Sequence, residues 1–301
     1  MAIQLRPRAD VLDEMPPRRL RNWSLPRSLY IAVYFVLAVL VFLPVAPWSN
    51  SSIPSGPLSG GPGSGDPTLM TWFLEWTAYA LSHGHNIFFT NYYLSPRGTS
   101  LFPYTSVPLL GVLTAPLTLK LGPVAAYNIL IRLSLAGSAT SMFLVLSSWS
   151  RRPYAFMGGV LFGFAPYIMT QSENHLDLAF LALLPPIIWC VAELIVLRRR
   201  SPIWLGFTLV VFAALQVYVS IEMLTLLAIV LGVGVVAYLS IHRQLCRDDL
   251  GYWLRGGGTL VLTFVVLAGY YLYNFLLGPG HLAGLVFPAT VLQRFHADAR
   301  I

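Results

Sequence analysis

Acidic residues are scarce in this chain, and five of its twelve Asp and Glu fall on the outer boundary of the topology predicted below. They are Asp66, Glu75, Glu173, Asp177 and Glu222. A carboxylate close to a membrane is costly unless it has a partner or a task. Carboxylates that gather in one place can take a proton from a hydroxyl or attract a cation. The plainer alternative is that each of the five is a solvated loop charge.

Asp66 is the strongest candidate for chemistry because it follows a glycine-rich approach and opens an amphipathic helix. Asp is also favoured as a helix N-cap, and the two roles are compatible. Glu75 follows on the same predicted helix, at an angle that points away from Asp66. That position is typical of a surface charge.

The run Glu173-Asn174-His175-Leu176-Asp177 is a dense polar cluster. Glu173 and Asp177 are four positions apart, so on a continuous helix they share a face. His175 can act as a base, a metal ligand or a hydrogen-bond donor to an anion. Carboxylates with a histidine can bind a divalent cation, but this spacing matches no ligand motif. We therefore predict no metal residues and leave the cofactor open.

Two further features of the sequence each have more than one explanation. Arg132 lies inside an apolar run, where it can pair with a phosphate or a carboxylate, or snorkel toward the surface. The aromatic runs at 87–89 and 92–93 can stack on sugars or on lipid, and an interfacial aromatic belt explains them as well.

The elements that position these residues must be membrane helices. The chain has 301 residues, of which 56% are hydrophobic and 10% charged, whereas a soluble domain carries about 25% charged residues. Several apolar runs reach the ~20 residues that cross a bilayer core. The expected fold class is all-α, a polytopic transmembrane helix bundle of about seven spans. The net charge of +7 fits the positive-inside bias of membrane proteins. The sequence shows no basic patch of the kind that binds nucleic acid.

Charge placement selects the topology. Treating 107–121 as non-spanning places every Arg cluster in the cytoplasm, with the N-terminus inside and the C-terminus outside. If 107–121 spanned, the clusters at Arg151 and Arg198 would lie outside. The predicted spans are then 28–47, 122–148, 154–170, 178–197, 203–219, 223–241 and 258–277, and no pair of them is visibly interrupted.

The chain divides accordingly into a basic cytoplasmic tail (1–27), a transmembrane module (28–277) and a short outer tail (278–301). The first outer loop, 48–121, carries two interfacial helices at 66–82 and 107–121. Cys190 falls in a span and Cys246 in a cytoplasmic loop, so no disulfide is expected.

Three runs resemble the GT-C superfamily of membrane glycosyltransferases, which use polyprenyl-phosphate sugars. They are GDPTLMTWFLEWTAYALSHGHNIFFTNYYLSPRG (65–98), SVPLLGVLTAPLTLKLGPVAAYNILI (106–131) and GGVLFGFAPYIMTQSENHLDLAF (158–180). They look like uncharacterised bacterial, actinobacterial-like members. The resemblance covers 28–277 and is one of topology and loose motif.

The resemblance implies an inverting hexosyl- or pentosyltransferase at the outer face of the plasma membrane. Its donor would be a polyprenyl-phosphate sugar and its acceptor a lipid, glycan or protein. Asp66 matches the acidic residue that acts as general base on the acceptor hydroxyl. The resemblance also implies that the substrate site is lined by Glu173, His175, Asp177 and Glu222. The candidates to hold the lipid phosphate are Arg132 and Lys120.

Two departures from the family pattern leave alternatives open. Pro67 follows Asp66 where many relatives have a second acidic residue, which weakens any claim to a metal. The chain stops at Ile301, where relatives continue with more spans, so a truncated or non-catalytic subunit that holds a membrane protein partner is one alternative. A transporter or flippase of a lipid-linked substrate is another, and it requires interrupted spans at depth.

Overall fold

The computed structural model describes residues 25–54, 65–93, 95–242, 250–278 and 281. Most of both predicted tails, and Cys246, lie outside the described residues. The described part is mostly helical. Its elements in chain order are α1 (Arg27–Val41), α2 (Asp66–His83), β1 (Phe89–Thr90), β2 (Thr99–Ser100), α3 (Pro108–Leu121), α4 (Pro123–Leu146), α5 (Arg152–Gly163), α6 (Pro166–Asn174), α7 (Leu176–Ala179), α8 (Leu184–Ala192), the π-helix η2 (Glu193–Leu197), α9 (Pro202–Val217), α10 (Ile221–Ile241) and α12 (Leu250–Leu276).

Four helical stretches of the described chain are long and apolar enough to cross a membrane. They are Pro123–Leu146, Leu176–Leu197, Ile221–Ile241 and Leu254–Leu276, and shorter apolar helices occur at Arg27–Val41, Pro108–Leu121 and Pro202–Val217. Large aliphatic side chains on α10 and α12 are exposed, including Val230, Val233, Leu262 and Val266. Such a surface suits lipid and would be unfavourable in water.

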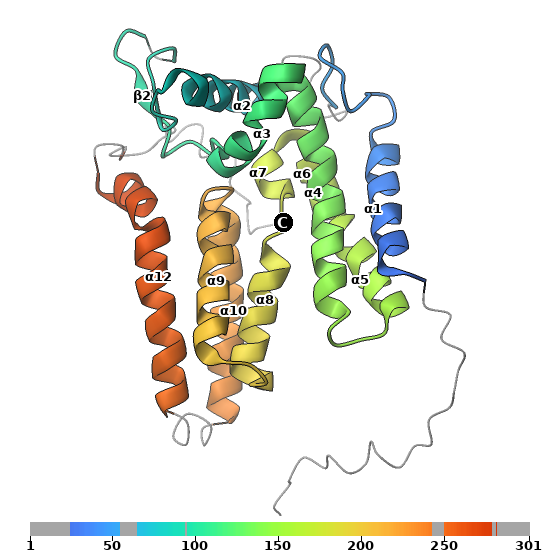
Figure 1. Ribbon diagram of the computed structural model, residues 1–301, viewed down its shortest axis with the longest axis vertical. Coiled ribbons are helices and arrows are strands. Elements are labelled where there is room, and N and C mark those ends of the chain that lie inside the picture. The colour runs from blue at the N-terminus through green and yellow to red at the C-terminus, as the bar shows by residue number, and fades with distance from the viewer. Residues whose placement is uncertain (1–24, 55–64, 94, 243–249, 279–280, 282–301) are drawn as a thin grey trace, which may run out of the picture.

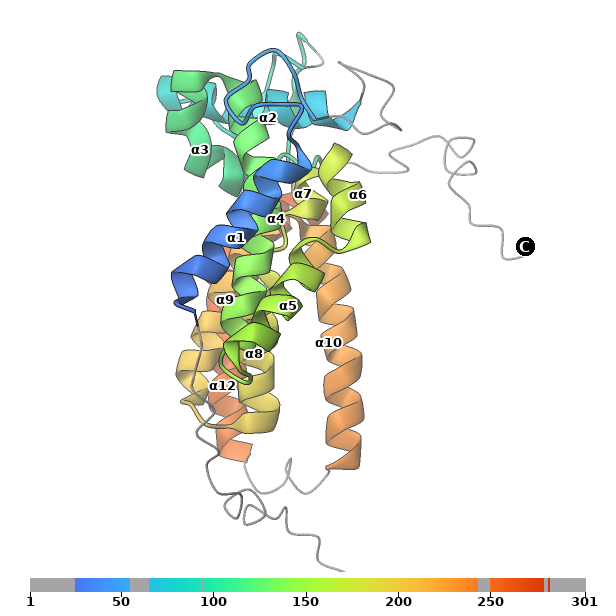
Figure 2. The same cartoon turned by 90° about the vertical axis from the view of Figure 1, so that its right-hand side faces the viewer.

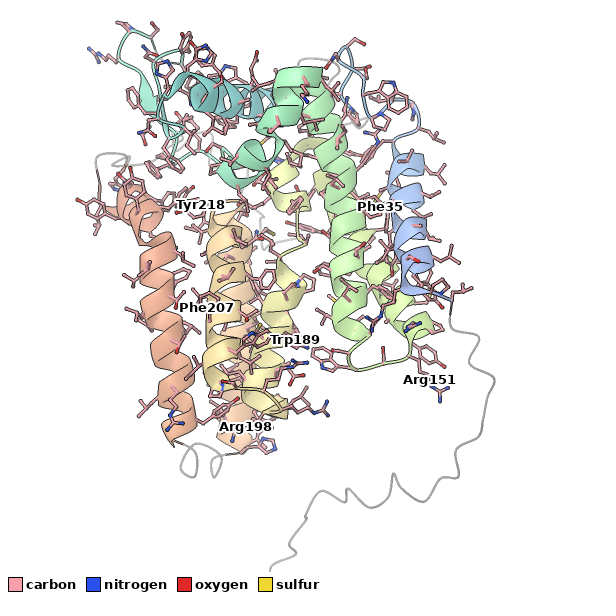
Figure 3. All side chains as sticks on the ribbon, in the orientation of Figure 1. Phe35, Arg151, Trp189, Arg198, Phe207 and Tyr218 are labelled. Atoms are coloured by element: carbon pink, nitrogen blue, oxygen red, sulfur yellow. The ribbon has the colours of Figure 1, made fainter. Side chains whose placement is uncertain are left out.

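The helices form two groups that are bridged at one end (Figures 1 and 2). One group consists of α1, α4 and α5, and the other of α8, α9, α10 and α12. At the bridged end α2 crosses the bundle, with α3, α6 and α7 beneath it (Figure 1). Arg151 and Arg198 both lie at the opposite end, as the predicted topology requires (Figure 3).

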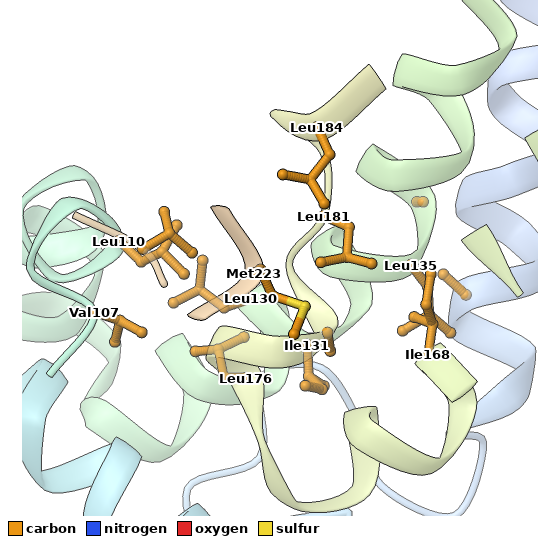
Figure 4. Close-up of a cluster of buried hydrophobic side chains, with 14 of the residues drawn as sticks. Val107, Leu110, Leu130, Ile131, Leu135, Ile168, Leu176, Leu181, Leu184 and Met223 are labelled. Carbon is orange, nitrogen blue, oxygen red and sulfur yellow. The ribbon is translucent and has the colours of Figure 1, made fainter. Parts of the chain in front are cut away.

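The main hydrophobic core lies just below the bridge, where the two groups meet. Leu130 and Ile131 of α4 pack there with Leu176 of α7, Leu181 and Met223 of α10 (Figure 4). Because these residues come from segments far apart in the sequence, the core fixes the start of α7 against α4.

The segment that carries α2, β1, β2 and α3 folds back on itself. In α2, Phe73, Leu74 and Thr77 are buried, and a Cβ on Gly111 of α3 would lie 2.8 Å from the Thr77 side chain. The small residue lets α2 and α3 approach closely. β1 and β2 pair antiparallel, with Phe89 opposite Ser100 and Thr90 opposite Thr99. This short hairpin was not predicted.

Two predicted spans are interrupted, contrary to the expectation of unbroken helices. The third ends its first helix at Gly163 and starts again at Pro166, because proline disfavours helical backbone in the residue before it. The fourth is broken between Ala179 and Leu184 and ends in the π-helix η2. The last helix also begins earlier than predicted, so Arg255 lies within α12 rather than in a loop.

Candidate functional site

Asp66 is the first residue of α2, directly after Gly65, whose φ of 71° suits glycine. The N-cap position is occupied by Gly65, and Asp66 lies in the first turn of the helix. The side chain is 53% exposed, and Oδ2 lies 3.4 Å from Nδ1 of His175. The N-cap explanation of Asp66 is therefore not realised, and its charge is directed at a partner on another element.

His175 lies between two short helices. The chain leaves helical geometry there, with φ −122° and ψ 90°, so α6 ends at Asn174 and α7 begins at Leu176. The imidazole is 37% exposed. The prediction that Glu173 and Asp177 share a helix face is wrong, because His175 breaks the helix between them. Glu173 is half-buried on α6.

Asp177 is buried behind His175, with 5% of its surface exposed. Among the described residues its Oδ1 accepts no hydrogen bond. Its charge is attracted by His175 and repelled by Glu222. His175 is therefore in contact with an exposed carboxylate on α2 and interacts electrostatically with a buried one on α7.

Tyr127 on α4 was missed from the sequence. It is fully buried, its hydroxyl has no hydrogen-bond partner within the described chain, and it is close enough to Asp177 and Asp66 for their charges to act on it. A buried unpartnered hydroxyl costs free energy unless a ligand or water satisfies it. One tyrosine among fifteen carries no signal in the sequence that would single it out.

Glu222 completes the outer edge of the site from the other helix group. It is exposed in the first turn of α10, which Ser220 caps by accepting a hydrogen bond from the Met223 amide at 3.4 Å. Tyr167 of α6 lies near both Glu222 and Asp177, and its hydroxyl is 3.7 Å from Sδ of Met223. The site thus spans both groups of helices.

Arg132 is buried and engaged by the protein itself. Its guanidinium donates to the carbonyls of Asn128 at 2.7 Å, Phe42 at 3.0 Å and Val45, and it lies over the Phe42 ring. These contacts fasten the end of α1 to α4 and account for Arg132 without a ligand. Lys120, in the last turn of α3, is exposed.

The arrangement offers acid–base chemistry. Among the described residues, no three His, Cys, Asp or Glu side chains are grouped so that they could hold a metal ion. What the geometry provides is an accessible carboxylate, an imidazole in contact with it, and a buried carboxylate with a buried phenol behind them. Such a set can accept a proton from a hydroxyl and stabilise the resulting charges.

No family model, curated protein or solved structure matches this chain.

Proposed function

We propose that this protein is a membrane glycosyltransferase that moves a sugar from a polyprenyl-phosphate donor to a hydroxyl of a lipid, glycan or protein acceptor. The reaction would take place at the outer face of the plasma membrane, with inversion at the sugar carbon. The observation that carries the proposal is the contact between Asp66 and His175 at the bridged end of an apolar helix bundle.

In the proposed step Asp66 is the general base. The acceptor oxygen attacks the anomeric carbon, the bond from that carbon to the phosphate oxygen breaks, and polyprenyl phosphate leaves with the electron pair. The acceptor's proton passes to the Asp66 carboxylate as the new glycosidic bond forms. The transition state resembles an oxocarbenium ion, so nearby carboxylates favour it electrostatically.

His175 and Asp177 would act on Asp66 rather than on the sugar. A protonated His175 fixes the orientation of the Asp66 carboxylate at 3.4 Å. Buried Asp177 interacts electrostatically with His175 and so would help to hold the imidazole in place. When Asp66 takes the acceptor's proton, its attraction to His175 weakens, and the proton can then leave to solvent through the exposed imidazole. Lys120 is the exposed cation nearest in sequence to the site helices and is the candidate partner of the donor phosphate.

A transporter of a lipid-linked substrate is the second candidate, and the interrupted helices favour it. The breaks between α5 and α6 and between α7 and α8 occur in consecutive segments of the described chain. Broken helices often surround a transported substrate. In this alternative the unpartnered Tyr127 hydroxyl and the free Oδ1 of Asp177 would bind a headgroup in passage rather than support a transfer.

The test is sugar transfer in membranes that contain this chain and a labelled polyprenyl-phosphate sugar, with wild type beside Asp66→Asn. We expect wild-type transfer and at least a ~100-fold loss in the variant, the scale of a general base. Lys120→Met, matched for size, should raise KM for the donor while retaining kcat.

The other outcomes have definite meanings. Equal transfer by wild type and Asp66→Asn would remove Asp66 from the chemistry. Absence of transfer by folded, membrane-inserted wild type would favour the accessory subunit. Movement of labelled lipid across sealed vesicles without transfer would establish the transporter.

A further inference from the structure

A row of aromatic rings covers one face of α2 and continues onto the loop that follows it. We define it as the aromatic ladder: Trp72, Trp76, Tyr79, His83, His85, Tyr92 and Tyr93. The first four recur at spacings of four, three and four, so they share a face of the helix. Phe73, Leu74 and Thr77, on the other side of α2, are buried in the protein.

The rings of the ladder are mutually ordered. Trp72 and Trp76 are stacked with centroids 6.2 Å apart and planes at 9°. Tyr79 stacks on His83 at 4.1 Å, and the planes of His83 and His85 differ by 7°. These contacts join the rings into one cluster. Trp76 is buried and Trp72 and Tyr79 are half-buried, so the exposed rings are those of His83, His85, Tyr92 and Tyr93.

The loop side of the ladder adds hydroxyl groups. Tyr92 packs against Trp76 at 5.6 Å, and its hydroxyl lies 3.3 Å from that of Tyr79. This hydrogen bond raises the pKa of the Tyr79 hydroxyl. Tyr92 is 67% exposed and Tyr93 42%, while Glu75 and Asn91 are exposed beside them. The surface therefore combines apolar ring faces with polar ring edges.

We infer that the aromatic ladder binds a glycan chain. Sugar rings have an apolar face of C–H groups and an edge of hydroxyls, which matches aromatic faces flanked by phenol, imidazole, amide and carboxylate groups. The apolar helices α10 and α12 expose mainly Leu, Ile and Val, so an aromatic surface is not a general property of this exterior. In Figure 1, α2 lies beyond the end of α12.

The ladder also leads toward the candidate site. Trp72 follows Asp66 by six residues, which is about 9 Å along the helix axis. A glycan lying along the ladder would therefore bring one end to the start of α2, where the Asp66 carboxylate is. That this glycan is the sugar acceptor rests on the proposed function, whereas binding by the ladder does not.

Binding is tested with the full chain in nanodiscs, titrated with maltohexaose, mannohexaose and arabinohexaose as probes. Calorimetry and tryptophan fluorescence report the affinity. We expect at least one probe to bind, and Trp72→Ala and Tyr92→Ala each to weaken it about ten-fold, the scale of a lost stacking contact. Trp149→Ala removes an exposed ring at the turn between α4 and α5 and should leave binding unchanged.

Tyr92 is exposed on a loop, so its variant keeps the test valid if Trp72→Ala does not fold. Binding that is unaffected by folded Tyr92→Ala and Trp72→Phe, or no binding of any probe by folded wild type, would overturn the inference. Quenching of Trp72 by brominated lipids, measured as the difference between wild type and Trp72→Phe, would instead assign the ladder to the membrane interface.

Asp66→Asn separates this inference from the proposed function. The variant should bind the probe like wild type while transfer is lost. If wild type binds the probe but shows no transfer, the inference that the ladder binds a glycan is retained and the proposed enzyme activity is refuted.

Discussion

The two groups of helices are packed in different ways. Where α5 meets α4 and α1, a Cβ on Gly159 would lie 2.7 Å from the Ala139 carbonyl and would overlap the Tyr34 hydroxyl. In the other group, α9 and α12 meet closely at Gly206 but then diverge around an apolar cavity of about 540 Å³. A second apolar cavity, of about 270 Å³, lies among α8, α9, α10 and α12.

This contrast shows how the protein is held together in lipid. Because lipid tails are as apolar as Leu, the hydrophobic effect does not draw membrane helices together, and tight contact requires small residues. The α1–α4–α5 group has them at its interfaces. In α10, Gly232 and Gly234 have open space around them, and no residue in the span's most apolar window is buried. The site residues of α4, α6 and α7 thus rest on the rigid group, and lipid completes the other.

The largest difference between the two groups is expected when a glycine is replaced by a large residue. Gly159→Leu should abolish folding or destabilise the protein by about 3 kcal/mol or more, because backbone surrounds the new side chain. Gly232→Leu, the matched change in α10, should alter the free energy of unfolding by less than ~0.5 kcal/mol. Unfolding in SDS titrations would measure both. Equal losses would mean that the two groups are packed alike.

The next effect concerns Arg132, which joins α1 to α4. Arg132→Met removes the guanidinium hydrogen bonds to the Phe42, Val45 and Asn128 carbonyls, so we expect a loss of about 3 kcal/mol. Lys120→Met is the control, since Lys120 is exposed and should change stability by less than ~0.5 kcal/mol. If Arg132→Met stays stable but loses the donor lipid, the arginine binds phosphate instead.

A smaller effect is expected at Asp177. Asp177→Asn keeps the shape and removes a buried charge, so stability should change by less than ~1 kcal/mol, in contrast to Arg132. Under the proposed function, transfer should fall about ten-fold because His175 loses its electrostatic interaction with the buried Asp177 charge. Transfer assays beside SDS titrations separate the two readouts. A large loss of stability with normal transfer would make Asp177 structural.

The smallest expected effect on stability concerns the contact between the loop that follows β2 and helix α12. Tyr271 donates a hydrogen bond to the Phe102 carbonyl at 3.2 Å, and Tyr271→Phe should cost about 1 kcal/mol. Hydrogen exchange in 99–104 should rise with it. Tyr270→Phe, whose ring is 61% exposed, is the matched control and should change neither. If the amides of 99–104 stay protected from exchange in Tyr271→Phe, packing of the aromatic ring alone is enough to hold this loop.

Apolar length and charge predicted much of the fold. Runs of hydrophobic residues located the helices at 123–146, 221–241 and 254–276, and Asp66 was expected to open its helix, which it does. The break at Pro166 was readable in principle from the residue preceding proline, but a long apolar run concealed it. The seven-span count, the orientation and the interfacial position of α2 and α3 remain predictions.

The site was less accessible to sequence analysis. Asp66 and His175 were both candidates, but their contact joins segments that only the packed bundle brings together. Tyr127 looks like any aromatic residue near a helix end, and only its burial without a partner distinguishes it. Arg132 was proposed for a phosphate, yet the carbonyls that it contacts come from the end of α1, which no local pattern specifies.

The Tyr271–Phe102 hydrogen bond joins residues 169 positions apart. A ribosome therefore makes α2 and α3 long before the helix whose Tyr271 binds the segment between them. A nascent chain arrested before α12 would carry Asp66 and His175 without this hydrogen bond.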